Sequence, residues 1–342
     1  MSEQLGREEV QLIEATAGRM SRLKAELHKK IVGLDGPIED LMCSVLAQGH
    51  TLLVGVPGLA KTMLIQTLSA ALSLDFRRIQ FTPDLMPSDI TGATVITQDA
   101  ATGERKFVFS PGPIFANVVL ADEINRTPPK TQAALMEALE ERHVTAGGKK
   151  YDLPRPFFVL ATQNPIEQEG TYQLPVAQLD RFMFMINVDY PSFDEEYEVM
   201  RLTTSSYEAK LEPLFTREEI LRLNEITRRI RVPNDLIRYA MRLTRRSRSQ
   251  SGNAPAFIRE WLTWGGGPRA TQYLLLGAKA RAVLAGRPEA EPRDVRAVAH
   301  AVLRHRIMLS YHAEAESIDA DEVITELLES TPSPDGKAVS AA

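Results

Sequence analysis

The sequence predicts an α/β protein in which a parallel β-sheet lies between helices, followed by a small domain made of helices only. Two observations predict the first part. Short apolar, β-prone runs alternate with helical stretches, and the glycine-rich segment GVPGLAKT lies directly between one such run and a helix. The second part is predicted by a change of pattern after Pro191, beyond which the periodicity is helical throughout.

Composition narrows the class of protein. The 342 residues suggest about two domains, and 40 basic against 45 acidic side chains leave a net charge of −5. That charge argues against attraction of the whole protein to nucleic acid, although not against a local basic patch. Cys43 is the only cysteine, which excludes an intramolecular disulfide and a four-cysteine zinc site. The opening MSEQLGREEV lacks signal-peptide features, and no run approaches the roughly 18 apolar residues of a membrane span. We therefore expect a cytoplasmic enzyme or switch.

The N-terminal segment, residues 1–30, predicts an amphipathic helix from about residue 3. Its apolar residues are spaced by three and four, namely Val10, Ile13, Ala17, Met20, Leu23 and Leu27. Gly33 and the turn at 35–37 end this helix. Pro37 suits the first turn of a second helix.

Residues 31–191 predict the α/β core. Five apolar runs read as strands, at 50–54, 75–81, 117–121, 157–161 and 183–188. Helical patterns follow the glycine-rich segment as far as about Leu72 and occupy 129–142. Strands that alternate with helices indicate a parallel sheet covered on both faces. Two insertions, at 93–109 and 143–154, each read as a β-hairpin around a polar turn.

Residues 192–329 predict the second domain. We expect helices at about 193–207, 216–230, 233–248, 268–286 and 291–304. The tail at 330–342 is small and polar, and we expect it to be disordered.

The segment between the first strand and its helix is typical of a phosphate-binding loop. Glycine allows backbone N–H groups to surround phosphates, and the following helix adds partial positive charge. Lys61 is placed to reach the β- and γ-phosphates, and the Thr62 hydroxyl to bind Mg²⁺. Ala60 stands where the general pattern has glycine, but alanine is small and tolerates negative φ, so we expect the loop to survive. A chance Gly/Pro turn before Lys–Thr is the competing interpretation. The predicted nucleotide-binding residues here are Gly55, Pro57, Gly58, Leu59, Ala60, Lys61, Thr62 and Met63.

Polar residues end two further strands. Asp122 and Glu123 follow the buried run VVLA, and Asn164 follows FFVLATQ. Active sites of parallel sheets lie at the carboxyl ends of strands. Asp122 would hold Mg²⁺ through water, and Glu123 would polarise the attacking water. A solvated helix cap for the acids and an Asn–Pro turn for Asn164 remain as alternatives.

Several long motifs together resemble the MoxR family of AAA+ ATPases, over roughly residues 20–310. They are GHTLLVGVPGLAKT, FTPDLMPSDITG, LADEINRTPPKTQAALMEALEER, ATQNP and LPVAQLDRF. The resemblance implies a P-loop AAA+ core with a helical lid. It also implies that the hairpin at 93–109 is the helix-2 insert and that at 143–154 the pre-sensor-1 insert.

The resemblance also assigns roles to single residues. It implies that Asn164 is sensor 1, that Arg181 in QLDRF is an arginine finger acting on a neighbouring subunit's ATP, and that Arg269 in GGGPRA is sensor 2, reaching the phosphates from the lid. Residues 31–33, with Val32 and Gly33, resemble the segment that packs on adenine. A local ion pair of Arg181 with Asp180, and a helix cap by Arg269, are the competing interpretations.

The function implied by the resemblance is ATP hydrolysis with Mg²⁺ in a homo-oligomer, as a hexameric ring. Such a machine would mature or assemble client proteins in a chaperone-like role, with a von Willebrand A-domain protein as partner and no nucleic-acid partner. Two alternatives stay open: a nucleic-acid motor of the same clade, and a nucleotide-gated switch with negligible turnover. The motor could use nine arginines between 222 and 248, although a solvated face or a subunit contact explains them as well.

Overall fold

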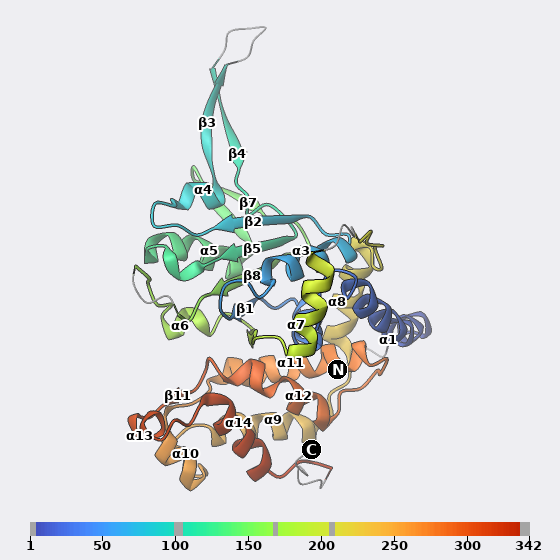
Figure 1. The fold of residues 1–342 in the computed structure, drawn as a ribbon, viewed down its shortest axis with the longest axis vertical. Helices are drawn as coiled ribbons and strands as arrows, with labels where there is room; N and C mark the ends of the chain where they lie inside the picture. Colours follow the sequence, from blue (N-terminus) through green and yellow to red (C-terminus); the bar gives the residue numbers. More distant parts are fainter. Residues whose placement is uncertain (1–4, 99–104, 167–169, 205–208, 336–342) are drawn as a thin grey trace.

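The computed structural model describes residues 5–98, 105–166, 170–204 and 209–335 (Figure 1). It confirms the predicted fold class. A single five-stranded sheet has the order β2-β5-β8-β1-β9, and all its neighbouring strands are parallel. The five predicted runs form these strands: β1 (Thr51–Val54), β2 (Phe76–Gln80), β5 (Val118–Asp122), β8 (Phe158–Gln163) and β9 (Phe184–Asn187).

Both faces of the sheet are buried along β1, β5 and β8, which are apolar at almost every position, whereas the edge strand β2 carries the exposed Arg77 and Arg78. Successive side chains point to opposite faces, so Leu52 packs into one core while its neighbour Leu53 packs into the other. The face that contains Leu53 is covered by α1 (Arg7–Leu27), α2 (Asp35–Ala47) and α3 (Lys61–Ala71). The face that contains Leu52 is covered by α4 (Pro87–Thr91) and α5 (Pro129–Glu141).

Two antiparallel hairpins lie outside the sheet within the α/β core. The longer pair, β3 (Gly92–Gln98) with β4 (Arg105–Pro111), projects well beyond the rest of the molecule (Figure 1). Its turn, residues 99–104, lies outside the described residues. The shorter pair joins β6 (His143–Ala146) to β7 (Lys149–Asp152).

The region after Pro191 is mainly helical. It contains α7 (Phe193–Thr203), α8 (Arg217–Arg229), α9 (Asn234–Arg246), α11 (Pro268–Leu284) and α12 (Pro292–Leu303), at the five predicted places. Three further helices are present that we did not expect, α10 (Ala256–Trp261), α13 (Tyr311–Ala315) and α14 (Ala320–Ser330). A short antiparallel pair, β10 (Leu262–Trp264) with β11 (Met308–Leu309), departs from the expectation of helices only. It joins the segment that follows α10 to the segment that precedes α13.

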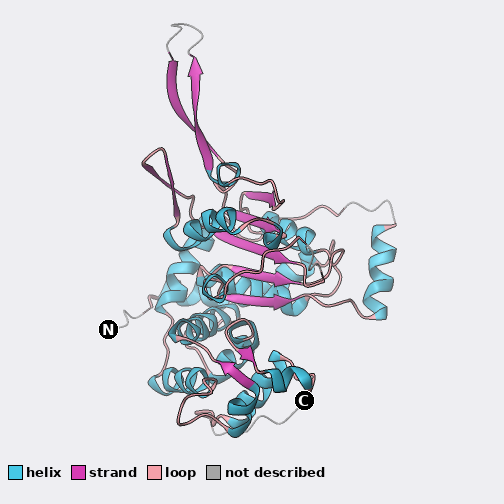
Figure 2. Ribbon diagram, turned by 90° about the vertical axis from the view of Figure 1, so that its left-hand side faces the viewer, coloured by secondary structure: helices cyan, strands magenta, loops and turns pink. Residues whose placement is uncertain are grey.

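The helical region shares a core with the sheet. Leu53 of the sheet, Ile38 of α2, Val298 of α12 and Leu327 of α14 belong to one cluster of buried apolar side chains. α11 packs against α1 and α2. α8 is fixed to the end of α2, because the Asn224 amide donates to the carbonyls of Val45 and Leu46 at 2.7 and 3.1 Å. In contrast, α7 buries none of its side chains and stands apart from the body, at the right in Figure 2.

The first residues of the expected disordered tail have defined contacts. Ser333 and Asp335 accept hydrogen bonds from Arg296 of α12, and Thr331 is buried. Residues 336–342 lie outside the described residues. Within the described part of the chain, no helix combines the length and apolarity that crossing a membrane requires.

Candidate nucleotide site

The glycine-rich loop connects the end of β1 to the start of α3 and curls at the carboxyl edge of the sheet. Gly55 lies so close to β9 that a Cβ there would come within 2.5 Å of the Val188 carbonyl oxygen. Gly58 has φ +88°, a conformation that favours glycine, and the space around its Cα is open. The loop therefore uses one glycine for close packing and the other for its turn.

Ala60 corrects one expectation about this loop. We expected negative φ, but Ala60 has φ +52° and ψ +19°, in the left-handed region. The Cβ atom makes that conformation cost about 1–2 kcal/mol. The turn into α3 demands it, which explains why the general pattern has glycine at this position.

Lys61 begins α3 and folds back over the loop. Its ammonium donates to the carbonyl oxygens of Gly55 and Val56, at 2.6 Å each. Partial burial lowers the pKa of Lys61, while the nearby carboxylates of Asp122 and Glu123 oppose that shift. These two hydrogen bonds hold the Lys61 ammonium against the backbone at the start of the loop.

Asp122, the last residue of β5, is buried, and both of its carboxylate oxygens accept hydrogen bonds. One carboxylate oxygen accepts from the Thr162 hydroxyl of β8. The other accepts from Arg78 of β2, at 2.7 Å from Nη2 and 2.9 Å from Nε. The carboxylate therefore lies between the two strands that flank β5.

Glu123 turns the chain sharply after β5, with φ +57° and ψ +49°. Left-handed backbone at a non-glycine residue is costly and recurs at functional sites. Its N–H donates to the Thr162 hydroxyl oxygen at 2.8 Å. Its carboxylate accepts from the Gln80 amide at 2.8 Å and from Arg126 at 2.9 Å. The two adjacent acids are therefore held in different directions by different partners.

Asn164 follows β8 and is buried. Its side-chain oxygen accepts from the Ile166 N–H at 3.2 Å, as in an Asx turn. This turn is compatible with the sensor 1 role. It uses only the side-chain oxygen, so the amide nitrogen stays available, and the Asn164 side chain lines the same cleft as the loop.

A cleft of about 390 Å³ brings most of the predicted residues together. Its walls comprise residues 57–63 of the loop and α3, with Arg78, Asp122, Glu123, Thr162, Gln163 and Asn164. The backbone of the loop, the Lys61 ammonium, the Thr62 hydroxyl and the Asp122 carboxylate are the kinds of group that bind Mg²⁺ and a polyphosphate. Mg²⁺ commonly binds through one or two carboxylates plus phosphates. No cluster of three or more His, Cys, Asp or Glu side chains that could hold a metal occurs among the described residues.

A second, more apolar cavity of about 500 Å³ adjoins the first and shares residues 58–60 and Met63 with it. Ile31 and Val32 line it, as the adenine assignment requires. Gly33 does not line it but lies against α7, where a Cβ would come within 2.3 Å of a Glu195 carboxylate oxygen. Glu195, Val199, Leu202 and Thr203 of α7 form the outer wall.

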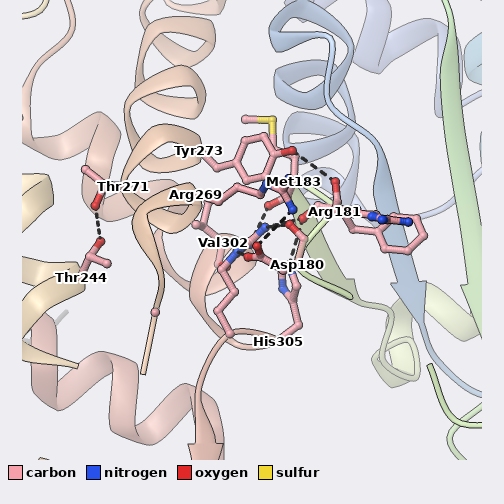
Figure 3. Close-up of polar contacts among 12 residues, drawn as sticks. Asp180, Arg181, Met183, Thr244, Arg269, Thr271, Tyr273, Val302 and His305 are labelled. Atoms are coloured by element: carbon pink, nitrogen blue, oxygen red, sulfur yellow. Dashed lines mark hydrogen bonds and ion pairs between the residues drawn. The ribbon is translucent and has the colours of Figure 1, made fainter. Parts of the chain in front are cut away.

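Arg181 and Arg269 are not among the residues that line either cavity. They lie together where α6 (Val176–Leu179) and β9 meet the start of α11 (Figure 3). The Arg181 Nε binds Glu140 of α5 at 2.8 Å, and Arg269 binds Asp180 at 3.2 Å and the same Glu140 oxygen at 3.5 Å. Because α11 begins beside residues 180–183, the finger segment that carries Arg181, Arg269 lies next to Arg181 and not in its own chain's cleft. Arg181 pairs with Glu140, and the contacts of this cluster show no pair with Asp180.

Sequence reasoning missed three polar partners of the acidic pair, Arg78, Gln80 and Thr162. Gln80 is the last residue of β2, so the rule that pointed to Asp122 could have found it had the end of that strand been placed one residue earlier. Nothing local marks Arg78 rather than Arg77 as the partner of Asp122. The wall contributed by α7 depends on how the chain folds back after β9.

The arginines between 222 and 248 are largely used within the chain. Arg222 and Arg229 pair with Glu8 and Glu9 of α1, and Arg231 pairs with Glu289. Arg242, Arg246 and Arg248 donate to backbone carbonyls. Two of these six arginines therefore tie the helical region to α1, and the other four make contacts within the helical region.

Comparisons with known proteins agree with this geometry. Residues 50–184 match the model of the ATPase family associated with various cellular activities (AAA), and residues 258–327 match an AAA lid domain. Chaperone MoxR1 of Mycobacterium tuberculosis is 41% identical over 337 residues, covering 95% of this chain and 88% of its own length. Protein MoxR of Methylorubrum extorquens is 29% identical, with 92% and 95% covered. The crystal structure of a Cytophaga hutchinsonii protein superimposes with a TM-score of 0.84 at 38% identity, covering 93% and 96%.

Proposed function

The chain belongs to the MoxR family of AAA+ ATPases, and from that membership and its site we propose that it hydrolyses ATP to ADP and phosphate in a ring-shaped homo-oligomer. The observation that carries the proposal is the division of the site. The loop, the acidic pair and Asn164 share one cleft, whereas Arg181 and Arg269 lie together outside it. A complete site then requires two subunits.

The chain's own cleft binds the nucleotide and prepares the water. The base enters the apolar cavity against Val32, and the phosphates lie on the loop, where Lys61 neutralises their charge. Thr62 and Asp122 are the residues that would hold Mg²⁺, which supplies charge neutralisation at the phosphates when bound. Glu123 serves as general base, oriented by Gln80 and Arg126. Asn164 offers its amide nitrogen to the attacking water or the γ-phosphate.

The two arginines serve the neighbouring subunit. Arg78 is the single arginine among the described residues that line the phosphate cleft, and its guanidinium is paired with Asp122. The charge that develops on the transferred phosphoryl group therefore needs a cation from elsewhere. Arg181 and Arg269 are partly exposed and lie side by side, which suits insertion into an adjoining cleft. Arg269 then reaches the phosphates from the helical lid, as the sensor 2 assignment implies, but at the neighbour's site.

We further propose that the projecting hairpin contacts client proteins. Val95, Ile96, Phe107 and Val108 of β3 and β4 are all exposed apolar side chains. Exposed apolar surface of this kind marks interaction sites. A chaperone-like role, a hexameric ring, a von Willebrand A-domain partner and a cytoplasmic location complete the proposal, and the relative named Chaperone MoxR1 supports the first.

Mixing two inactive variants tests the proposal. Lys61→Ala subunits have a defective cleft but keep Arg181, whereas Arg181→Ala subunits have an intact cleft but offer no finger. Together they should form some interfaces with one good cleft and one good finger, so phosphate release should partly return and rise with protein concentration. A mixture that stays inactive although native mass measurement shows mixed oligomers would refute action across the interface. A monomer with full activity would refute the ring.

A further inference from the structure

Arg306, at the end of α12, is a buried cation that none of the proposed roles uses. Its guanidinium donates from Nε to the Asp180 carboxylate at 2.8 Å. Its Nη2 donates to the carbonyls of Asp180 and Phe182, and its Nη1 to those of Met183 and Val302. An arginine side chain has five N–H donors, and all five have acceptors here.

Four of these five acceptors belong to residues 180–183, the segment that carries Arg181. The same segment receives two more contacts from the helical region. The Tyr273 hydroxyl of α11 donates to the Arg181 carbonyl at 3.2 Å (Figure 3). His305 donates from Nε2 to the Phe182 carbonyl at 3.1 Å, as a neutral ring, because burial lowers the pKa of His305 well below its usual value. The finger segment is thus attached to the helical region at every residue from 180 to 183.

Asp180 extends this attachment to the second arginine. One of its carboxylate oxygens binds Arg306, and the other binds Arg269 at 3.2 Å. Glu140 then joins Arg269 to Arg181 through a single oxygen. Arg306 also lies 5.0 Å from the centre of the Tyr273 ring. The partly exposed guanidinium groups of Arg181 and Arg269 are therefore linked through Asp180 and Glu140 to the buried guanidinium of Arg306.

We infer that Arg306 is a positioning residue for the site across the subunit interface: it fixes residues 180–183 and Asp180 to the helical region, so that Arg181 and Arg269 are presented to the neighbour as one unit. The inference rests on the proposed function, since it concerns arginines that act in trans.

General stabilisation alone does not require this arrangement. A buried ion pair can often be replaced by apolar side chains without loss of stability, because desolvation offsets most of its attraction. What an apolar side chain or a lysine cannot do is hold four backbone carbonyls and a carboxylate in a fixed planar pattern. The expected consequence of losing Arg306 is misplacement of the arginines, with the chain's own cleft unaffected.

The test uses a mixture in which the cleft and the arginines come from different chains. Arg181→Ala chains supply every working cleft, and Lys61→Ala chains supply every working pair of arginines. Adding Arg306→Lys to the Lys61→Ala chain should lower the turnover of the mixture at least tenfold, with KM for ATP unchanged because the working clefts are unaltered. A purely structural role would lower the unfolding temperature of that chain without this loss.

Two further variants of the Lys61→Ala chain, which supplies the arginines, complete the design. Arg287→Lys in the Lys61→Ala chain is the matched control, because Arg287 forms a two-bond pair with Asp294 inside the helical region, at 2.6 and 2.9 Å. That variant should restore activity as the Lys61→Ala chain does. Asp180→Asn conserves side-chain volume and should reproduce the loss, and it decides the matter if the Arg306→Lys chain does not assemble.

The outcomes separate this inference from the proposal beneath it. If Lys61→Ala chains that also carry Arg306→Lys or Asp180→Asn restore the turnover of the mixture to within twofold of the reference, the positioning role is overturned and the trans assignment stays intact. An inactive reference mixture of Arg181→Ala with Lys61→Ala would overturn the trans assignment itself, and the positioning role with it.

Discussion

Replacing Glu123 with glutamine removes the proposed general base while leaving the shape of the cleft. Loss of a general base lowers turnover by roughly 10²–10⁴, which corresponds to about 2.7–5.4 kcal/mol of activation free energy. The cost to folding should be far smaller. The carboxylate pairs with Arg126 at 2.9 Å near the surface, where such pairs contribute about 0.2–1 kcal/mol. The glutamine amide oxygen can still accept from Gln80 or Arg126.

The assay for Glu123→Gln combines three measurements on the assembled protein. Phosphate release should fall at least 100-fold, whereas the dissociation constant of a fluorescent ATP analogue and the unfolding temperature should change little. Glu137→Gln, an exposed position on α5, is the matched control and should retain full activity. Hydrolysis within about threefold of the wild-type rate would refute the assignment of Glu123. Loss of nucleotide binding would show that Glu123 shapes the cleft instead.

Three further changes probe the same site and its support. Lys61→Ala should raise the dissociation constant of the ATP analogue strongly, because it removes the ammonium at the floor of the loop; unchanged affinity would place the phosphates elsewhere. Ala60→Gly should raise the free energy of unfolding by up to about 1 kcal/mol, since relief of left-handed strain outweighs the added freedom of the unfolded chain; a loss of stability by denaturant titration would contradict this. Burial lowers the pKa of His50 from 6.5 to about 4. Between those values the unfolded chain binds a proton that the folded chain does not, so this group's contribution to stability is lost as pH falls from about 6.5 to 4. The difference of about 2.5 corresponds to up to about 3 kcal/mol, and His50→Gln should flatten the measured pH dependence; an equally steep variant would exclude His50 as its source.

Local pattern was sufficient for much of the fold. The five strands and the helices α1, α2, α3 and α5 appear where the sequence pattern predicts them, whereas the short helix α4 was not expected. The inner strands are easy to find because a buried parallel strand must be apolar at nearly every position. Other local signals were present but not used. Asp319 and Glu322 form a capping box at the start of α14, a helix that we did not expect.

The candidate site divides along the same line. The sequence by itself determined the loop, Lys61, the acidic pair and Asn164, because each follows a strand directly and parallel strands end at one edge of the sheet. Only the tertiary structure decided the partners of these residues. Because β5 lies between β2 and β8, Arg78, Gln80 and Thr162 reach the acids across more than 35 positions of sequence.

The place of the two arginines was likewise decided by tertiary packing. Motifs singled out Arg181 and Arg269, but their meeting depends on how α11 docks against the segment between α6 and β9. Arg269 lies 89 positions from its partner Asp180 in sequence. Contacts of that kind arise from the core that the sheet shares with the helical region, and short-range periodicity does not predict them. The sequence therefore identifies the residues of the candidate site, and the packing of the helical region determines where Arg181 and Arg269 lie relative to the others.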